Sequence, residues 1–194
     1  MITCILLAAG LSERFGSPKA LAKINGSTVI EHLQNQLISS KVSEIIVVLG
    51  AHFENIKPYI LKHNKVKFVY NKDYNFGQTS SFQCALRQLS EKTKGVMLLP
   101  VDYPFITIKL IDSLIDCFCE GKESLVVIPI KGQRKGHPPI FNIKLKNDFL
   151  VLDHSVGMNV VAKKYKDETL FVPVDDESIF STFNTKEELE DLKS

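Results

Sequence analysis

The sequence predicts an α/β fold, namely a three-layer, open and mostly parallel sheet with helices on both faces. Short segments rich in β-branched residues alternate along the chain with longer segments of helical periodicity. Several of the short segments are apolar at consecutive positions, as expected of strands buried on both faces of a parallel sheet. The 194 residues contain no internal repeat, low-complexity tract or long linker, so we expect one domain over 1–194.

The expected strands are short apolar runs. In chain order they cover residues 3–9, 44–50, 67–70, 95–100, 124–130 and 169–174. After residue 130 the alternation loosens, because the segment 131–142 is polar and then rich in proline before it returns to a short strand. We expect this second part of the chain to complete the same sheet and to supply the pocket of a second substrate.

The expected helices lie between the strands, over 27–40, 53–63, 80–91 and 108–120. The first of them has apolar residues that recur on one helical face, at Val29, Ile30, Leu33, Leu37 and Ile38. Pro58 is expected to shorten or break the second helix. Thr185 and Glu188 have the spacing of a capping box, which predicts the start of the last helix.

The composition is that of a soluble globular protein, with 44% hydrophobic residues, 24% charged residues and a net charge of +2. Such a charge attracts neither nucleic acid nor a membrane surface strongly. Cys4, Cys84, Cys117 and Cys119 form no CxxC pair, so we expect buried thiols rather than a zinc site. No apolar run approaches the length of a membrane span, and Met1 leads into the first strand without a leader pattern, which predicts a cytoplasmic protein.

The segment ILLAAGLSERFGSPK (5–19) follows the first expected strand and combines glycines with positive charge. Gly10 and Gly16 permit a close approach of the backbone, and backbone amides in such a loop hold phosphate oxygens. Arg14 and Lys19 add cationic donors for the same oxygens. The spacing matches neither the P-loop nor the dinucleotide fingerprint. We therefore expect a different polyphosphate loop, the alternative being a mobile connection with incidental charges.

Two further segments reach the same edge of the predicted sheet, where ligands of open α/β sheets bind. Asp102 follows the strand 95–100, and a carboxylate placed there beside a polyphosphate suits Mg²⁺. A capping role for Asp102 at a turn explains the residues equally well. The short polar residues after the strand 67–70 either contact a pyrimidine base or ribose or cap the following helix.

Five ordered motifs resemble the MobA-like nucleotidyltransferases. The segment LLAAGLSERFGSPKALAKINGSTVIEH (6–32) is similar to the family signature LAAGxSxRMGxxKxLLxxxGxxLL. The other four are NKDYNFGQTSSFQCAL (71–86), LLPVDYPFI (98–106), KGHPPIF (135–141) and FNTKEELEDL (183–192). Together they span nearly the whole chain. The form Ala8-Ala9-Gly10 resembles the molybdenum cofactor cytidylyltransferases, whereas the guanylyltransferase branch usually has Leu-Ala-Gly-Gly.

The resemblance implies that residues from about 1 to 105 bind the nucleotide and residues from about 106 to 194 bind the acceptor. It implies catalytic roles for Arg14, Lys19 and Asp102. The implied nucleotide-binding residues are Leu7, Ala8, Ala9, Gly10, Ser12, Gly16, Asn71, Gly77, Thr79, Ser80 and Ser81. The implied acceptor-binding residues are Gly136, His137 and Pro138. The implied ligands of Mg²⁺ are Asp102 and Asn184.

The chain departs from the family pattern at two places. STFNT stands where the family usually has DIDT, so Thr182 and Asn184 replace two aspartates. Asn184 offers a neutral oxygen to the metal, and Asp175 and Asp176 lie nearby in the sequence. LDHSVGMN (152–159) is similar to the family's GDxGAR, with Asn159 in place of the arginine.

The resemblance implies a Mg²⁺-dependent enzyme that moves CMP from CTP to the phosphate of molybdopterin cofactor and releases pyrophosphate. One alternative keeps this reaction type with GTP, or with a sugar or alditol phosphate as acceptor. A second alternative is a non-catalytic chaperone that carries molybdenum cofactor to a molybdoenzyme. The implied partners are small-molecule substrates and a molybdoenzyme, with neither nucleic acid nor membrane.

Overall fold

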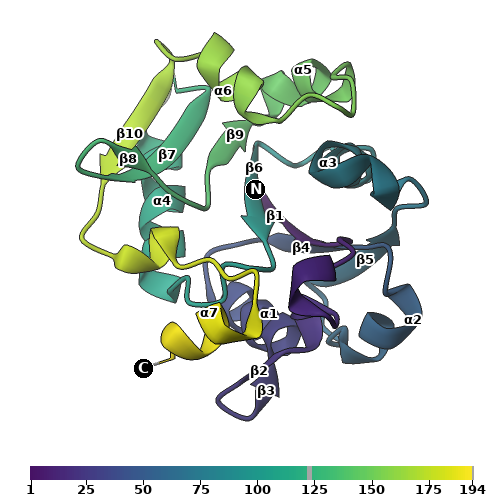
Figure 1. Ribbon diagram of the computed structural model, residues 1–194. Coiled ribbons are helices and arrows are strands. Elements are labelled where there is room, and N and C mark those ends of the chain that lie inside the picture. Colours follow the sequence, from purple (N-terminus) through teal and green to yellow (C-terminus); the bar gives the residue numbers. More distant parts are fainter. Residues whose placement is uncertain (122–123, 194) are drawn as a thin grey trace.

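The main sheet of the protein is open and mostly parallel. The computed structural model describes residues 1–121 and 124–193. Among these, eight strands form one sheet in the order β10-β7-β9-β6-β1-β4-β5, with β8 paired to β7 (Figure 1). They are β1 (Ile2–Ala8), β4 (Glu44–Leu49), β5 (Val66–Tyr70), β6 (Gly95–Pro100), β7 (Val126–Lys131), β8 (Arg134–Lys135), β9 (Ile140–Asn142) and β10 (Thr169–Pro173). The expected fold class is confirmed.

The strand β1 lies inside the sheet and runs parallel to both of its neighbours, β4 and β6. Leu7 lies opposite Val48 of β4 on one side and Pro100 of β6 on the other. Because these strands run in one direction, their carboxyl ends meet at one edge of the sheet. β9 is the exception in the centre, since it pairs antiparallel with both β6 and β7.

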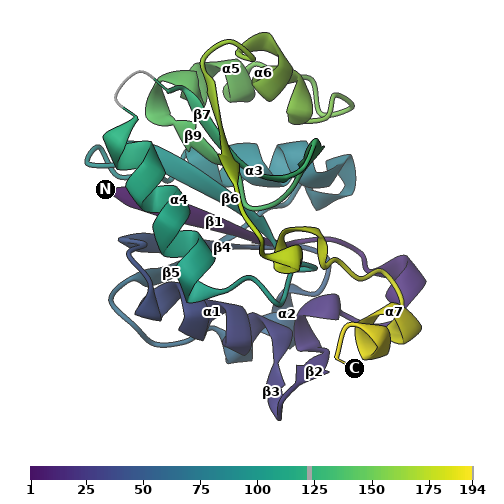
Figure 2. The same cartoon turned by 90° about the vertical axis from the view of Figure 1, so that its left-hand side faces the viewer.

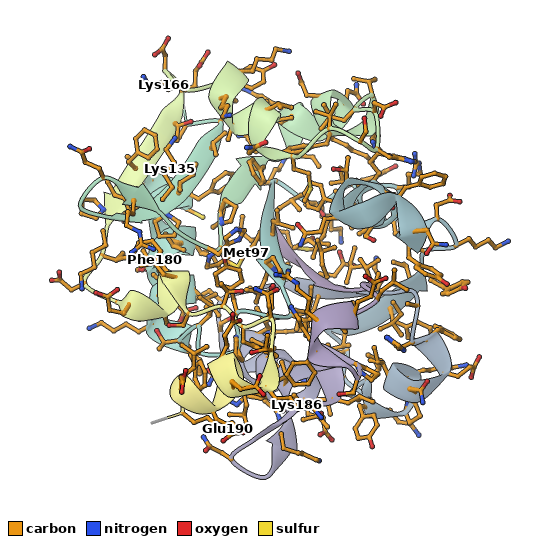
Figure 3. The ribbon with its side chains drawn as sticks, viewed as in Figure 1. Met97, Lys135, Lys166, Phe180, Lys186 and Glu190 are labelled. Atoms are coloured by element: carbon orange, nitrogen blue, oxygen red, sulfur yellow. The ribbon has the colours of Figure 1, made fainter. Side chains whose placement is uncertain are left out.

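Two hydrophobic cores cover the two faces of the sheet, because alternate side chains of β1 point to opposite sides. Cys4 and Leu6 belong to the core under α1 (Val29–Ser39), α2 (Phe53–Ile56), α4 (Ile108–Glu120) and α7 (Lys186–Asp191). Ile5 and Leu7 belong to the core under α3 (Gly77–Leu86), α5 (Lys146–Leu150) and α6 (Asn159–Lys164). Figure 2 shows the strands between these two groups of helices, and Met97 of β6 lies near the middle of the molecule in Figure 3.

Most of the expected elements are present, with some differences at their ends. α2 stops at Ile56 and a 3₁₀ turn with Pro58 follows, so the expected break is confirmed. α3 begins at Gly77, three residues before the expected start, because the hydroxyl of Ser80 is satisfied by backbone carbonyls of the preceding turn. The antiparallel hairpin of β2 (Lys23–Ile24) and β3 (Ser27–Thr28), as well as β8, α5 and α6, were not expected.

The chain ends in α7, which lies beside the segment that follows β1 in both Figure 1 and Figure 2. Half of the predicted capping box forms, since Thr185 Oγ1 accepts a hydrogen bond from the Glu188 amide at 3.2 Å. The carboxylate of Glu188 instead accepts from the amide of Asn184, one residue before the cap. This arrangement fixes the backbone of Asn184. None of the helices in the described part of the chain is long and apolar enough to cross a membrane.

Candidate active site: two adjoining cavities at one edge of the sheet

A cavity of about 180 Å³ lies at the carboxyl ends of β1 and β6, and we call it the donor cavity. Of the predicted nucleotide-binding and catalytic residues, those that line it are Leu7, Ala8, Ala9, Gly10, Ser12, Lys19, Gly77, Ser81 and Asp102. The walls also include residues that the sequence did not single out, namely Pro18, Ala20, Ile56, Tyr74, Gln78, Pro100 and Val101.

The loop after β1 is shaped by two left-handed backbone positions. Ser12 has φ 56° and Gly16 has φ 74°, and they flank a single 3₁₀ turn over Glu13–Phe15. The side chain of Ser12 accepts a hydrogen bond from the Lys19 amide at 3.2 Å, which closes the loop. Gly16 does not line the cavity; its positive φ is the reason for a glycine at this position.

Arg14 and Lys19 extend toward the same atom. Arg14 Nη2 and Lys19 Nζ donate to Asn184 Oδ1 at 2.8 and 2.9 Å. Lys19 Nζ also lies 3.8 Å from Asp102 Oδ2 and 5.5 Å from the ring centre of Phe183. Burial lowers the pKa of Lys19 below its usual 10.5, and the neighbouring Asp102 carboxylate partly opposes this shift. The two predicted cations and the predicted carboxylate are therefore brought together by the C-terminal segment.

Asp102 has an unusual environment for a carboxylate. Its Oδ1 atom is buried and has no hydrogen-bond partner among the described residues. Its backbone carbonyl accepts from the Phe183 amide at 3.2 Å, which fixes the position of the residue. A buried acceptor without a donor is costly unless a cation or a donor of the ligand reaches it. Asp102 therefore fits the metal role that the sequence suggested.

Within the described part of the chain, no group of three or more His, Cys, Asp or Glu side chains is placed to hold a metal ion. A divalent ion at Asp102 would thus depend on substrate phosphates and water for its other ligands, which is the usual arrangement for Mg²⁺. Asn184, the second predicted ligand, has both lone pairs of its side-chain oxygen directed to cationic donors.

The polar residues after β5 hold one another in place. Asn71 Nδ2 donates to the hydroxyls of Ser80 and Ser81 at 3.1 and 3.0 Å. Thr79 donates to the Val156 carbonyl at 2.8 Å. All four side chains are buried, and only Ser81 among them lines the donor cavity. The structure thus places Ser81 at the cavity and Asn71, Thr79 and Ser80 behind it.

A second cavity, of about 510 Å³, adjoins the first, and we call it the acceptor cavity. Gln78, at the start of α3, lines both cavities. Of the predicted acceptor-binding residues, Gly136 and His137 line the second cavity, whereas Pro138 does not. The remaining walls are Leu98, Ile128, Lys135, Pro139, Phe141, Gly157, Met158, Asn159, Ala162 and Lys163.

The segment with Gly136 and His137 packs against the chain that leads to α7. The His137 amide donates to the Ile179 carbonyl at 3.0 Å. A Cβ atom at Gly136 would lie 2.6 Å from the Ile179 side chain, so only glycine fits there. Nearby, the Arg134 guanidinium lies 4.1 Å from the ring centre of Phe180, which is labelled below Lys135 in Figure 3.

The imidazole of His137 belongs to a residue of the acceptor cavity, and the charge of Asp102 in the donor cavity acts on it. Burial lowers its pKa from the usual 6.5, and the charge of Asp102 opposes this effect. The ring packs against Tyr103 with the ring centres 4.5 Å apart. His137 Nδ1 is buried and lacks a partner in the part of the chain that the structure describes. Burial therefore favours the neutral imidazole, and its Nδ1 is left open to a ligand.

Sequence reasoning missed Gln78 and Lys163, which both line the acceptor cavity. The sequence did indicate Gln78 indirectly, since it lies between Gly77 and the hydroxyl residues 79–81 of the motif 71–86. Lys163 follows Asn159 by four residues, so the two share one face of α6. That spacing was visible only once 159–164 was known to be helical.

Solved structures of other proteins share this fold. The Rv0371c protein of Mycobacterium tuberculosis H37Rv has a TM-score of 0.84 over 98% of this chain and 96% of that chain, at 22% identity. A structure of the same protein in complex with manganese has a TM-score of 0.76 over 98% and 97%, at 20% identity. A nucleotidyl transferase from Methanothermobacter thermautotroptrophicus has a TM-score of 0.84 over 100% and 96%, at 20% identity. At sequence identities this low, these comparisons show that the proteins share a fold.

The sequence relation is more specific. The MobA-like NTP transferase domain matches residues 4–169, and the chain belongs to this family. A probable UDP-N-acetylglucosamine pyrophosphorylase of Acanthamoeba polyphaga mimivirus is 32% identical over 64% of this chain and 51% of its own length. The nicotine blue oxidoreductase of Paenarthrobacter nicotinovorans is 27% identical over 75% and 72%. A probable molybdenum cofactor guanylyltransferase of Bacillus cereus (strain Q1) is 48% identical over 26% and 24%.

The relatives differ in length and in the activities that their names state. This chain spans about half the length of the pyrophosphorylase and about a quarter of the guanylyltransferase. Membership of the family therefore identifies the domain, while the substrates of this chain have to be argued from its own cavities.

Proposed function

We propose that this protein is a metal-dependent nucleotidyltransferase that moves a nucleotidyl group from a nucleoside triphosphate to the phosphate of a small acceptor. The observation that carries the proposal is the pair of adjoining cavities that share Gln78. One of them has Lys19 and the unsatisfied Asp102 oxygen in its wall, and the other is larger and bordered by Lys135 and Lys163. A triphosphate donor and an anionic acceptor suit these two environments.

The reaction is an in-line displacement at the α-phosphorus. An oxygen of the acceptor phosphate forms the new bond, the bond to the bridging oxygen breaks, and pyrophosphate leaves. The attacking phosphate is already an anion, so the reaction needs no general base. Lys19 and Arg14 neutralise charge on the departing pyrophosphate, and the cavities fix the two substrates in line.

Asp102 is the residue that would hold the divalent ion, since its buried Oδ1 has no partner among the described residues. Bound there, the ion supplies positive charge to the phosphate oxygens. The manganese complex of the Rv0371c protein supports divalent-metal binding in this fold. We take Mg²⁺ as the ion, with the second predicted ligand, Asn184, considered in the next subsection.

The finer proposal is CTP as donor and molybdopterin cofactor as acceptor, with the chain serving a molybdoenzyme in the cytoplasm. It is supported by the alanine at position 9, which lines the donor cavity, and by the resemblance of Ala8-Ala9-Gly10 to the cytidylyltransferases. The apolar part of the acceptor cavity, with Leu98, Phe141 and Met158, suits a ring system. We propose a donor half (1–105) and an acceptor half (106–194): the donor cavity is lined by residues of the first half, whereas the acceptor cavity takes Gln78 and Leu98 from the first half and its other walls from the second.

A second candidate keeps the reaction and changes the acceptor to a sugar phosphate. It is favoured by the match to the probable UDP-N-acetylglucosamine pyrophosphorylase, which covers 64% of this chain, against 26% for the probable guanylyltransferase. Residues of the acceptor half decide between these acceptors, and Asn159 stands there in place of an arginine.

Release of pyrophosphate tests the proposal. The purified chain is given each of the four NTPs with Mg²⁺, together with molybdopterin cofactor or a hexose 1-phosphate. Release with CTP and molybdopterin supports the finer proposal, and release with another pair supports the general one. Tight binding of molybdopterin without release under any condition would overturn the enzyme proposal in favour of the cofactor chaperone.

A further inference from the structure

We propose that Asn184 is a positioning residue that gathers Arg14 and Lys19 for the triphosphate, rather than a ligand of the metal. The inference rests on the proposed function and deepens it. Its starting point is the single oxygen, Asn184 Oδ1, that accepts from both cationic groups at 2.8 and 2.9 Å.

The amide oxygen of asparagine has two lone pairs, and both have a donor here. A metal ion at the same atom would have to displace Arg14 or Lys19. Asp102 differs in this respect, because its Oδ1 is buried without a partner in the described chain. The two predicted metal ligands therefore differ: the side-chain oxygen of Asn184 already accepts from two cations, whereas Asp102 Oδ1 has no donor among the described residues.

The shared acceptor also reduces the repulsion between two neighbouring positive charges. Arg14 and Lys19 repel each other when they approach, and a common acceptor offsets that repulsion. The Lys19 ammonium retains two further donors and the Arg14 guanidinium four, so phosphate oxygens can still be bound. Asn184 therefore fixes the positions of Arg14 and Lys19 and leaves them N–H donors for phosphate oxygens.

The neutrality of Asn184 matters for the same reason. With asparagine, the formal charge of Arg14, Lys19 and Asp102 together is +1, and an anionic triphosphate is attracted. An aspartate at position 184 would form ion pairs with both cations and bring this sum to zero. Mg²⁺ is usually bound through one or two carboxylates, so the neutral side chain at position 184 is a weaker ligand for it than an aspartate would be.

The backbone of Asn184 is itself held in place from both sides. Its amide donates to the Glu188 carboxylate. The preceding Phe183 is fully buried, packs edge-on against Phe15 with ring centres 5.4 Å apart, and donates its amide to the Asp102 carbonyl. The oxygen that receives the cations is thereby fixed relative to the carboxylate of the donor cavity.

The experiment measures binding of inorganic tripolyphosphate and of an NTP by calorimetry, in EDTA and then with Mg²⁺. Asn184→Ala should weaken metal-free tripolyphosphate and NTP binding roughly tenfold, the effect of one hydrogen bond to a charged group, while binding of the nucleoside changes little. Asn184→Asp should weaken metal-free binding at least as much. Lys193→Ala is the matched control, because it removes a C-terminal cation that pairs with Glu190 rather than with Asn184; it should retain tripolyphosphate affinity.

Unchanged tripolyphosphate affinity in Asn184→Ala would overturn the inference. So would an Asn184→Asp variant that needs less Mg²⁺ for NTP binding and keeps its full metal-free affinity, since that behaviour marks a metal ligand. A wild-type chain that binds no tripolyphosphate at all also overturns it. The proposed function fails separately, if tripolyphosphate binding depends on Asn184 while no NTP yields pyrophosphate.

Discussion

Lys19 meets three kinds of partner through one ammonium group: a neutral oxygen, a carboxylate and an aromatic ring. Its side chain is 13% exposed, so these contacts are made in a partly dehydrated setting where charge interactions are stronger than in water. Lys19 lines the donor cavity, and phosphate binding by this residue stays a prediction from the sequence.

Lys19→Ala and Asp102→Ala should each lower turnover by about 100-fold or more, because each removes a charge that acts on the phosphates. Pyrophosphate release measures the effect, and circular dichroism checks the fold. Lys41→Ala is the matched control, since Lys41 forms an exposed ion pair with Asp116 and should retain normal turnover. Near-normal release by Lys19→Ala or Asp102→Ala would remove that residue from the mechanism.

Ala9 lines the donor cavity and packs closely on Gly50, where a Cβ atom would lie 2.6 Å from the Ala9 carbonyl oxygen. Ala9→Gly removes a methyl group from the wall, and we expect it to reduce the preference for CTP over GTP by roughly tenfold, the value of one methyl group in a binding pocket. The ratio of the two kcat/KM values is the measurement. An unchanged ratio would mean that the base is recognised by other residues.

At the scale of elements, α1 begins with a complete capping box. Glu31 accepts from the Thr28 amide at 3.0 Å, and Thr28 Oγ1 accepts from the Glu31 amide at 3.3 Å. The hydrogen bonds from Thr28 hold the pKa of Glu31 below its usual 4.5. A carboxylate whose pKa is lowered by folding contributes stability above its unfolded pKa and loses it as the pH falls through the folded value.

Glu31→Gln should therefore lower the free energy of unfolding by about 0.5 kcal/mol at pH 7, a value kept small because the carboxylate is partly exposed. The difference from the wild type should shrink as the pH falls below 4.5. Urea unfolding at pH 7 and at lower pH measures it. A difference that is constant with pH would show that the charge of Glu31 makes no contribution.

Gln83 joins α3 to α5 and to the segment after it. Its Nε2 donates to the carbonyls of Phe149 and Leu152 at 2.8 and 2.9 Å, and its Oε1 lies 2.9 Å from His154 Nε2. The side chain is 2% exposed. Its role in the fold had no distinct signal in the sequence, because its partners lie more than sixty residues away along the chain.

Gln83→Leu should lower the free energy of unfolding by about 2–3 kcal/mol, since it leaves buried carbonyl groups without donors. For a chain of this size that corresponds to a Tm lower by roughly 5–10 °C, measured by calorimetry. Gln88→Leu, an exposed position just beyond the same helix, should change Tm little. Equal effects of the two substitutions would contradict the role given to Gln83.

The sequence predicted well those elements whose formation depends on neighbouring residues in the chain, such as a periodic apolar face or a proline. The apolar face of the first helix is buried at Val29, Ile30, Leu33 and Leu37, and Pro58 ends the second helix. The start of α3 was misplaced because hydroxyl side chains are poor helix formers in general, whereas the Ser80 hydroxyl is satisfied locally. The insertion of β9 between β6 and β7 has no local cause, so periodicity alone did not reveal it.

At the scale of the whole molecule, a common location for many of the predicted nucleotide-binding residues could be expected because they follow strands whose carboxyl ends share one edge of a parallel sheet. Contacts between distant segments could not. Arg14 and Asn184 are separated by 170 positions, and their hydrogen bond depends on the path of the C-terminal segment across the molecule. The same holds for Gln78, whose place at the junction of two cavities depends on where β9 and α6 lie.

The path of that segment has a consequence for how ligands of the two cavities would act on each other. Ile179 contacts Gly136 and His137 in the wall of one cavity, and Asn184, five residues later, holds the cations of the other. If one ligand shifts the segment 179–184 at Ile179, the position of Asn184 at the other end of this segment must change as well. We therefore expect the two occupants to be thermodynamically linked, so that each changes the affinity of the other by an equal factor.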